Sequence, residues 1–166
     1  KSNGMLYIMA AIYSLRSFLL IKGCKNNSIQ LRGAFLKNTR IRIDGTNNIV
    51  KIAHENRLNN CLIYKKGNNC EIFIEKHCIH ANTELWIEDD NGKITIDYRT
   101  TAEGGHIAAT EGKSIYIGKD CMFSHDIEIL NGDSHAIYML ENKLRINASK
   151  SVYLGHHVWF GSSIKV

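Results

Sequence analysis

The sequence predicts an all-β fold in which the chain winds into a parallel solenoid. Three observations support this prediction: apolar residues return every 22 positions, each repeat contains strand-like apolar pairs such as "IFI", "ITI" and "IYI", and proline is absent while Asn, Asp and Gly are frequent. Alternation with period two indicates strands. Turns of Asn, Asp and Gly use left-handed backbone conformations that these residues tolerate. With 166 residues and 44% hydrophobic content, the chain is long enough for one domain with a continuous core.

Residues 1–37 are predicted to form a short N-terminal helical cap and the lead-in to the solenoid. The stretch "MLYIMAAIYSLRSFLLIKG", residues 5–23, is apolar but contains two serines and an arginine near its middle. A membrane span needs about 20 predominantly apolar residues, so we expect instead a helix that covers the open end of the solenoid. The alternative is peripheral contact of residues 5–21 with a membrane surface.

Residues 38–166 are predicted to form the solenoid itself, because two apolar ladders and one polar ladder run through them. The first apolar ladder has a constant step of 22 residues and consists of Ile41, Ile63, Leu85, Ile107 and Ile129. The second has steps of 22, 22 and 21 residues and consists of Val50, Ile72, Ile94 and Ile115. Asn47, Asn69 and Asn91 share one turn register, where stacked asparagines can bond from coil to coil.

The repeat is interrupted at about residues 130–151. The next member of the ladder after Ile115 is Val152, which follows 37 residues later instead of 22, so 15 residues are extra. The inserted stretch contains "NGDSHAIYMLENKLRI". Loops that leave a rigid scaffold commonly carry functional side chains, so we expect this excursion to hold the functional site.

A finer spacing of six residues appears after Ile117. The blocks "IGKDCMFSHDIEI" and "LGHHVWFGSSIKV" place apolar residues six apart, and an aliphatic residue followed by glycine opens each block. From about residue 38 to the end, this pattern resembles the hexapeptide-repeat acyltransferases. The resemblance implies a left-handed parallel β-helix in which three hexads form one triangular coil.

The excursion and the coil after it carry the specific part of the resemblance. Sugar acetyltransferases of this family have a histidine in the loop, shortly before an arginine and a coil that reads like "IG..VWIG". This chain has His135, Arg145 and "LGHHVWFG" in the same order. The resemblance implies an O-acetyltransferase of capsular or lipopolysaccharide sugars with acetyl-CoA as donor. It also implies a homotrimer, because the active sites of the family lie between adjacent subunits.

The chemistry of acetyl transfer gives the candidate residues their roles. A sugar hydroxyl must lose its proton, and imidazole, with an ordinary pKa of about 6.5, is a base at neutral pH, so His135 is the candidate general base. Asp133 either orients the His135 ring or caps the "NGDS" turn, and local turn chemistry favours the cap. The resemblance assigns the backbone amide of Ser162 to the oxyanion. It also places Trp159, Gly161 and Arg145 at the donor site. Trp159 could instead pack between subunits.

Charge and cysteine content narrow the partners and the compartment. The formal charge of +5 comes from 21 basic and 16 acidic residues spread along the chain, which argues against a nucleic-acid surface and suits a phosphate-bearing small ligand. Five cysteines without a C-x-x-C motif, and no recognisable secretory signal, predict that the protein is located in a reducing cytoplasm. The alternative location is the inner face of the membrane.

Other clusters have plainer interpretations. "EKHCIH" contains His77, Cys78 and His80, but no second cluster stands at metal-ligand spacing, so we expect no metal. A γ-class carbonic anhydrase on this fold would leave the excursion unexplained. Trp86 follows an inward leucine, so it is expected to point outward in register with Tyr64, at a sugar, an interface or the plain surface.

The competing hypothesis is a non-enzymatic scaffold or an inactive fragment of such an enzyme. Members of the family usually continue for several hexads after the "VWIG" coil, whereas the present sequence stops at Val166. The excursion with His135 favours the enzyme. The identity of the acceptor sugar and of its modified hydroxyl does not follow from one chain.

Overall fold

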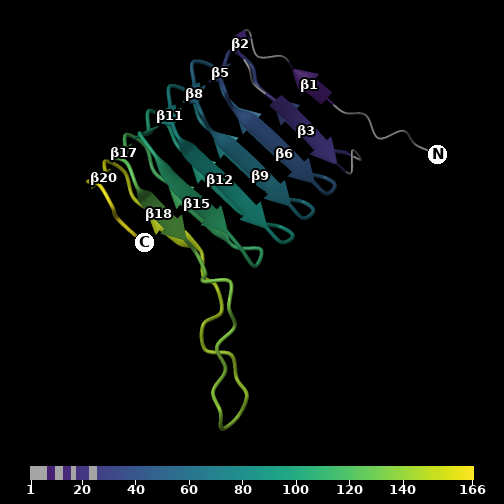
Figure 1. The fold of residues 1–166 in the computed structure, drawn as a ribbon, viewed down its shortest axis with the longest axis vertical. Coiled ribbons are helices and arrows are strands. Elements are labelled where there is room, and N and C mark those ends of the chain that lie inside the picture. Colours follow the sequence, from purple (N-terminus) through teal and green to yellow (C-terminus); the bar gives the residue numbers. More distant parts are fainter. Residues whose placement is uncertain (1–6, 10–12, 16–17, 23–25) are drawn as a thin grey trace, which may run out of the picture.

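The computed structural model describes residues 7–9, 13–15, 18–22 and 26–166, which form a parallel β-solenoid (Figure 1). Three sheets make up its sides. Sheet A contains β1 (Tyr7–Met9), β4 (Ser28–Gln30), β7 (Ile49–Ile52), β10 (Glu71–Ile74), β13 (Lys93–Ile96), β16 (Ser114–Ile117) and β19 (Val152–Leu154). Sheet B contains β2 (Tyr13–Leu15), β5 (Phe35–Lys37), β8 (Arg57–Asn59), β11 (Ile79–Ala81), β14 (Thr101–Ala102), β17 (Met122–Phe123) and β20 (Trp159–Phe160). Sheet C contains β3 (Phe18–Lys22), β6 (Arg40–Asp44), β9 (Leu62–Lys66), β12 (Thr83–Glu88), β15 (Gly105–Ala109) and β18 (Ile127–Leu130).

The strand register confirms the ladders predicted from the sequence. Ile72 pairs with Val50 on one side and with Ile94 on the other, so the 22-residue step is one coil of the solenoid. Ile115 pairs with Val152 across the 37-residue step, which confirms the excursion. The architecture agrees with the predicted parallel β-helix. Its left-handed sense is what the family resemblance implies.

Alternating side chains on each strand point into the solenoid and form one continuous core. In β10, for example, Ile72 and Ile74 are fully buried while their neighbours face outward. Each such isoleucine stabilises the fold by roughly 1.5–3 kcal/mol relative to an exposed side chain. Because each coil stacks only on its two neighbours, the core is built up coil by coil.

Two basic side chains, a lysine and a histidine, are among the buried polar residues of the described chain. Lys65 lies in register between Ile43 and Ile87 and is fully buried. Its Nζ donates to the carbonyl oxygens of Ile49, at 3.0 Å, and Cys70, at 2.5 Å. Burial lowers the pKa of Lys65 from 10.5 to about 7, because the charged amine is desolvated.

His80 is the buried histidine. It lies in register between Leu58 and Ala102, and neither ring nitrogen has a hydrogen-bond partner among the described residues. Burial lowers its pKa to about 4, so the ring is neutral at pH 7.

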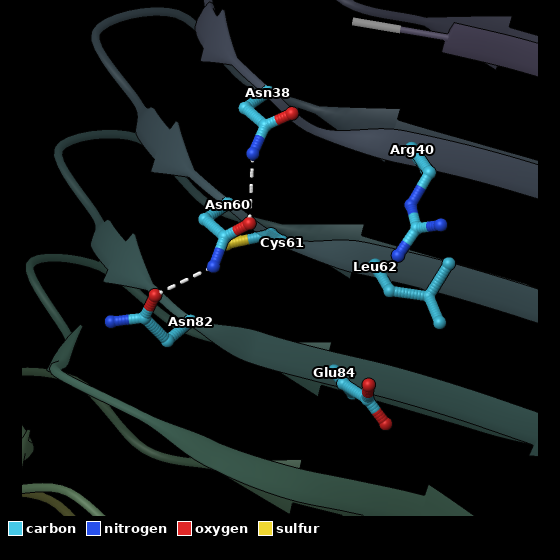
Figure 2. A pocket seen from close by; sticks show the side chains of 7 residues that line it. All are labelled: Asn38, Arg40, Asn60, Cys61, Leu62, Asn82 and Glu84. Carbon is cyan, nitrogen blue, oxygen red and sulfur yellow. Dashed lines mark hydrogen bonds between the residues drawn. The ribbon is translucent and has the colours of Figure 1, made fainter.

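Asparagines with left-handed backbone form the corner between sheets B and C. Asn38, Asn60 and Asn82 have φ values of 48°, 55° and 48°. Asn38 donates to the side chain of Asn60 at 2.9 Å, and Asn60 donates to that of Asn82 at 2.8 Å. Figure 2 shows this ladder beside Arg40 and Glu84, with which it lines a shallow groove. Of the ladder predicted at another corner, the first link forms, since Asn47 donates to Asn69 at 3.2 Å.

The described parts of residues 5–23 are strands and not the helix expected there. β1, β2 and β3 pair in parallel with β4, β5 and β6, so they continue the solenoid upstream. The remaining parts of the expected helix lie outside the described residues. Among the described residues, no helix is long and apolar enough to cross a membrane.

Candidate functional site

The excursion is an antiparallel hairpin that projects from the solenoid between β18 and β19 (Figure 1). Ile146 donates its N–H to the carbonyl of Ile137, and Met139 donates to that of Leu144, both at 2.9 Å. Several large apolar side chains of the hairpin are exposed: Ile137, Tyr138, Met139, Leu140, Leu144 and Ile146. A protruding arm of this composition is typical of a segment that packs on another surface.

Buried polar groups fix the root of the hairpin to the preceding coil. The side chain of Asn131 accepts from the N–H of Thr110 at 2.7 Å and donates to its carbonyl at 3.0 Å. Asn131 and Ser149 are both buried. A Cβ at Gly132 would lie 2.2 Å from Ser149 Oγ, so only glycine fits there without a local shift. The hairpin therefore leaves the solenoid from a defined point.

His135 stands at the start of the hairpin with an exposed side chain. Its ring has no hydrogen-bond partner within the part of the chain that the structure describes, so both nitrogens face solvent in one chain. The backbone of His135 is held instead: its N–H donates to Asp133 at 3.2 Å, and its carbonyl accepts from the side-chain amide of Asn147. The bond from the His135 N–H to the Asp133 side chain, two residues earlier, has the geometry of a turn cap. Asp133 also accepts from the side-chain amide of Asn147 at 2.9 Å.

Arg145 is bound to the hairpin and to the adjacent coil. Its guanidinium donates to Glu111 and, at 3.4 Å, to the side chain of Asn147. Glu111 also accepts from the N–H of Ser149 at 3.1 Å. The Arg145 hydrogen bond holds the pKa of Glu111 below its usual value, and the same bond raises the pKa of Arg145. In one chain, the charge of Arg145 is thus directed to Glu111.

Trp159 lies in β20 on the outer face of sheet B and is 76% exposed. It borders a partly apolar trough with a volume of about 320 Å³, which continues over Met122 and Thr101 to Ile79 on successive strands. Gly161 and Ser162 follow β20 and are exposed. The next residue, Ser163, donates its N–H to the carbonyl of His125 and its hydroxyl to the side chain of Asp126. The backbone at residues 161 and 162 is therefore stacked on the corner that these two residues form.

The candidate base and the candidate oxyanion donor lie at different corners of one chain. Ser162 stands near the corner that precedes β18, whereas His135 follows the end of β18. The four residues of β18 alone separate these corners by about 13 Å at roughly 3.3 Å per residue. Within one chain, His135 and Ser162 therefore do not lie together.

The side chains of the segment "EKHCIH" do not point to one common place. His80 and Cys78 are buried, while His77 bonds to Glu55 on the outside at 3.0 Å. Among the described residues, there is no group of three or more His, Cys, Asp or Glu side chains that could hold a metal ion.

Trp86 points outward in register with Tyr64, as predicted from the sequence. The two ring centroids are 4.1 Å apart, and the guanidinium of Arg42 lies 5.2 Å from the centroid of the Tyr64 ring. These side chains stack on one another along sheet C.

Sequence reasoning did not identify two members of the hairpin network, Glu111 and Asn147. Glu111 stands 22 residues after Asp89, so the repeat places both at the same corner, but the partner of Glu111 in the hairpin could not be known from the sequence. Asn147 stands two residues after Arg145, and only the folded hairpin places its amide beside residues 133 and 135.

The parallel solenoid, its six-residue spacing near the end and the inserted histidine hairpin are features that this chain shares with the hexapeptide-repeat acyltransferases. The sequence is 37% identical over 142 residues to a polysialic acid O-acetyltransferase of Neisseria meningitidis, an alignment that covers 85% of this chain and 66% of that protein. It is 30% identical over 91 residues to the Escherichia coli protein of the same name, covering 53% of this chain and 30% of that one. No family model matches the sequence.

Solved structures agree. The polysialic acid O-acetyltransferase OatWY superimposes with a TM-score of 0.83 at 33% identity, over 90% of this chain and 69% of that one. The polysialic acid-specific acetyltransferase NeuO has the same fold, with a TM-score of 0.72 at 21% identity, over 92% of this chain and 65% of that one. The chain belongs to the hexapeptide-repeat O-acetyltransferase family that includes the Neisseria protein and OatWY, and it spans about two thirds of their length.

Proposed function

We propose that this protein transfers an acetyl group from acetyl-CoA to a hydroxyl of a polymeric sialic acid. The names of its relatives support the acceptor and the acetyl group. The observation that carries the proposal is the hairpin with His135, which is inserted into a solenoid of this family with its imidazole ring exposed to solvent. A scaffold would not need such an insertion.

The residues of the site divide the reaction between them. His135 accepts the proton of the sugar hydroxyl as the oxygen attacks the carbonyl carbon of the thioester. The backbone N–H of Ser162 donates to the oxygen on which negative charge develops. The imidazolium of His135 then returns the proton to the departing sulfur. The carbon–sulfur bond of acetyl-CoA breaks, the acetyl group remains on the sugar oxygen, and coenzyme A leaves as the free thiol.

The trough beside Trp159 suits the donor. Its floor of Met122, Thr101 and Ile79 offers an apolar strip perpendicular to the strands, which matches the extended and largely apolar arm of coenzyme A. The indole of Trp159, 76% exposed in one chain, would cover the thioester end. We therefore assign Trp159 and Gly161 to the donor site.

A homotrimer would join the two halves of the site. Since His135 and Ser162 of one chain stand at different corners, a complete site needs the His135 hairpin of one copy beside the Ser162 corner of the next. The exposed apolar side chains of the hairpin, with Leu140 at 86%, would be covered in this assembly.

Replacement of His135 by Ala tests the chemistry. Loss of the general base should lower the rate of acetyl transfer to oligomeric sialic acid about 10²- to 10⁴-fold. The matched control is His54→Ala, since His54 is also exposed but lies in the turn between β7 and β8, away from the hairpin and from the Ser162 corner. Undiminished transfer by His135→Ala would remove the general-base assignment.

Mixed assembly tests the composite site. Ser162→Pro removes the N–H donor, and His135→Ala removes the base, so each variant alone should be inactive. When the two are unfolded, mixed in equal amounts and refolded together, about one quarter of the sites in a trimer receive an intact base and an intact donor from neighbouring copies. Absence of recovered activity, or only monomer in light scattering, would contradict the shared site.

We also propose a cytoplasmic location, with peripheral membrane contact through residues 5–21. Free buried thiols at Cys61, Cys70, Cys78 and Cys121 are consistent with a reducing compartment. Flotation with anionic vesicles, compared with a chain that starts at residue 26, tests the contact. Equal flotation of both proteins would contradict a role for the N-terminal segment.

A further inference from the structure

A hydrogen-bond network crosses the base of the hairpin and ends on the backbone of His135. Its centre is Asn147, whose side-chain amide nitrogen and oxygen both form hydrogen bonds. The amide nitrogen donates to both carboxylate oxygens of Asp133, at 2.9 and 3.2 Å, and to the carbonyl of His135. The amide oxygen accepts from the N–H of Ile137 at 2.7 Å.

These contacts link the two arms of the hairpin on both sides of His135. Asn147 is in the returning arm, while its partners are two residues before His135, His135 itself and two residues after it. The imidazole is therefore carried on a backbone that is clamped over five residues. Because the ring itself has no partner in the described chain, the direction in which it leaves the backbone depends on this clamp.

A brace connects the clamp to the solenoid. Arg145 Nε donates to the amide oxygen of Asn147 at 3.4 Å, and its terminal nitrogen donates to Glu111. Glu111 is held in turn, since its N–H donates to Asp89 at 2.9 Å and its carboxylate accepts from Ser149. The chain of contacts thus runs from a rigid corner to the backbone of the candidate base.

We propose that Asn147 is the positioning residue of His135, and that Glu111 and Arg145 set its position relative to the solenoid. This inference rests on the proposed function of His135. Asn147 acts through the backbone of the base and not on substrate. The network also gives Arg145 a role within its own chain, besides the donor contact that the family resemblance implies.

Asn147→Ala tests the clamp. A reacting group displaced by about 1 Å costs about 10²-fold in rate, so kcat should fall by about that factor while KM for acetyl-CoA and for the acceptor stays within about twofold. The control is Asn142→Ala at the tip of the same hairpin, where Asn142 accepts from Leu144 at 2.9 Å. It should leave kcat unchanged. An unchanged kcat in Asn147→Ala would overturn the proposal.

A double-mutant cycle separates positioning from general damage. If Asn147 acts only through His135, adding Asn147→Ala to His135→Ala should cause no further loss beyond about twofold. A further loss of about tenfold or more would overturn the positioning role, even with a valid general base. Full activity of His135→Ala alone would instead overturn the function on which the inference rests.

An exchange variant covers the case in which Asn147→Ala does not fold. Asn147→Asp places two carboxylates together and should lower kcat like the alanine variant. Combining it with Asp133→Asn restores an amide facing a carboxylate and should recover about tenfold in kcat. No recovery in a folded trimer would contradict the clamp.

Discussion

Replacing Lys65 with methionine removes a charged amine from the solenoid interior while keeping a flexible side chain of similar length. Lys65 lies in register between Ile43 and Ile87, and only two carbonyl oxygens, those of Ile49 and Cys70, receive its Nζ among the described residues. Burial lowers the pKa of Lys65 from 10.5 to about 7. The substitution therefore changes how stability depends on pH.

The sign follows from proton binding. Between the folded and unfolded pKa values the unfolded chain holds the proton and the folded chain does not, so the free energy of unfolding rises with pH, by at most about 1.4 kcal/mol per pH unit. From about pH 7 to pH 8.5 the contribution is about 1.5 kcal/mol, because the folded amine is half protonated at the start. Above the ordinary thiol pKa of 9.0, burial of thiols such as Cys78, whose pKa is raised to about 12, acts in the opposite direction.

Urea unfolding followed by circular dichroism between about pH 7 and pH 8.5 measures this slope. The Lys65→Met protein should lose about 1.5 kcal/mol of pH-dependent stabilisation. Lys66→Met is the control, because Lys66 is the exposed neighbour on the same strand and should keep the slope. If Lys65→Met and the natural protein have the same slope, the amine is not desolvated in the folded state, and the reasoning is wrong.

Three further outcomes are expected. His80→Leu matches the leucine one coil away and removes two unpaired ring nitrogens, so it should raise stability by about 1–3 kcal/mol at pH 7. Because the folded pKa of His80 is about 4, the natural protein loses stability as pH falls from 6.5 to about 4, and thermal melts should show less loss in His80→Leu. Asn60→Ala breaks two bonds of the asparagine ladder at a φ of 55° and should cost about 1–2 kcal/mol in urea unfolding, with Asn60→Gly costing less. Leu140→Asp places a charge at the hairpin tip and should shift light scattering from trimer toward monomer; an unchanged mass would exclude the tip from the interface.

The repeat could be predicted from sequence because each coil presents the same inward positions. The ladder even extended further upstream than expected, since Leu19 pairs with Ile41, 22 residues later. The helix predicted for this region was wrong where the structure describes it, because apolar residues without clear alternation fit a helix or a buried strand equally well.

Residues that break the pattern were not predictable in the same way. Lys65 stands 22 residues from both Ile43 and Ile87, so the repeat marks its position as inward, but the sequence does not show which carbonyl groups would receive a buried lysine there. The excursion and its histidine were visible as an irregular step. The clamp by Asn147 was not, because it depends on how the two arms of the hairpin close, which no spacing in the sequence encodes.

The buried cysteines give the solenoid a set of internal reporters. Cys61, Cys70, Cys78 and Cys121 are free and lie on several coils, and burial raises the pKa of each thiol, so none reacts readily while its coil is closed. In a stacked repeat, neighbouring coils can open separately from the whole. The rate at which each thiol is alkylated in the native protein therefore reports how often its own coil opens. Mass spectrometry of the labelled peptides would show which coil unfolds first.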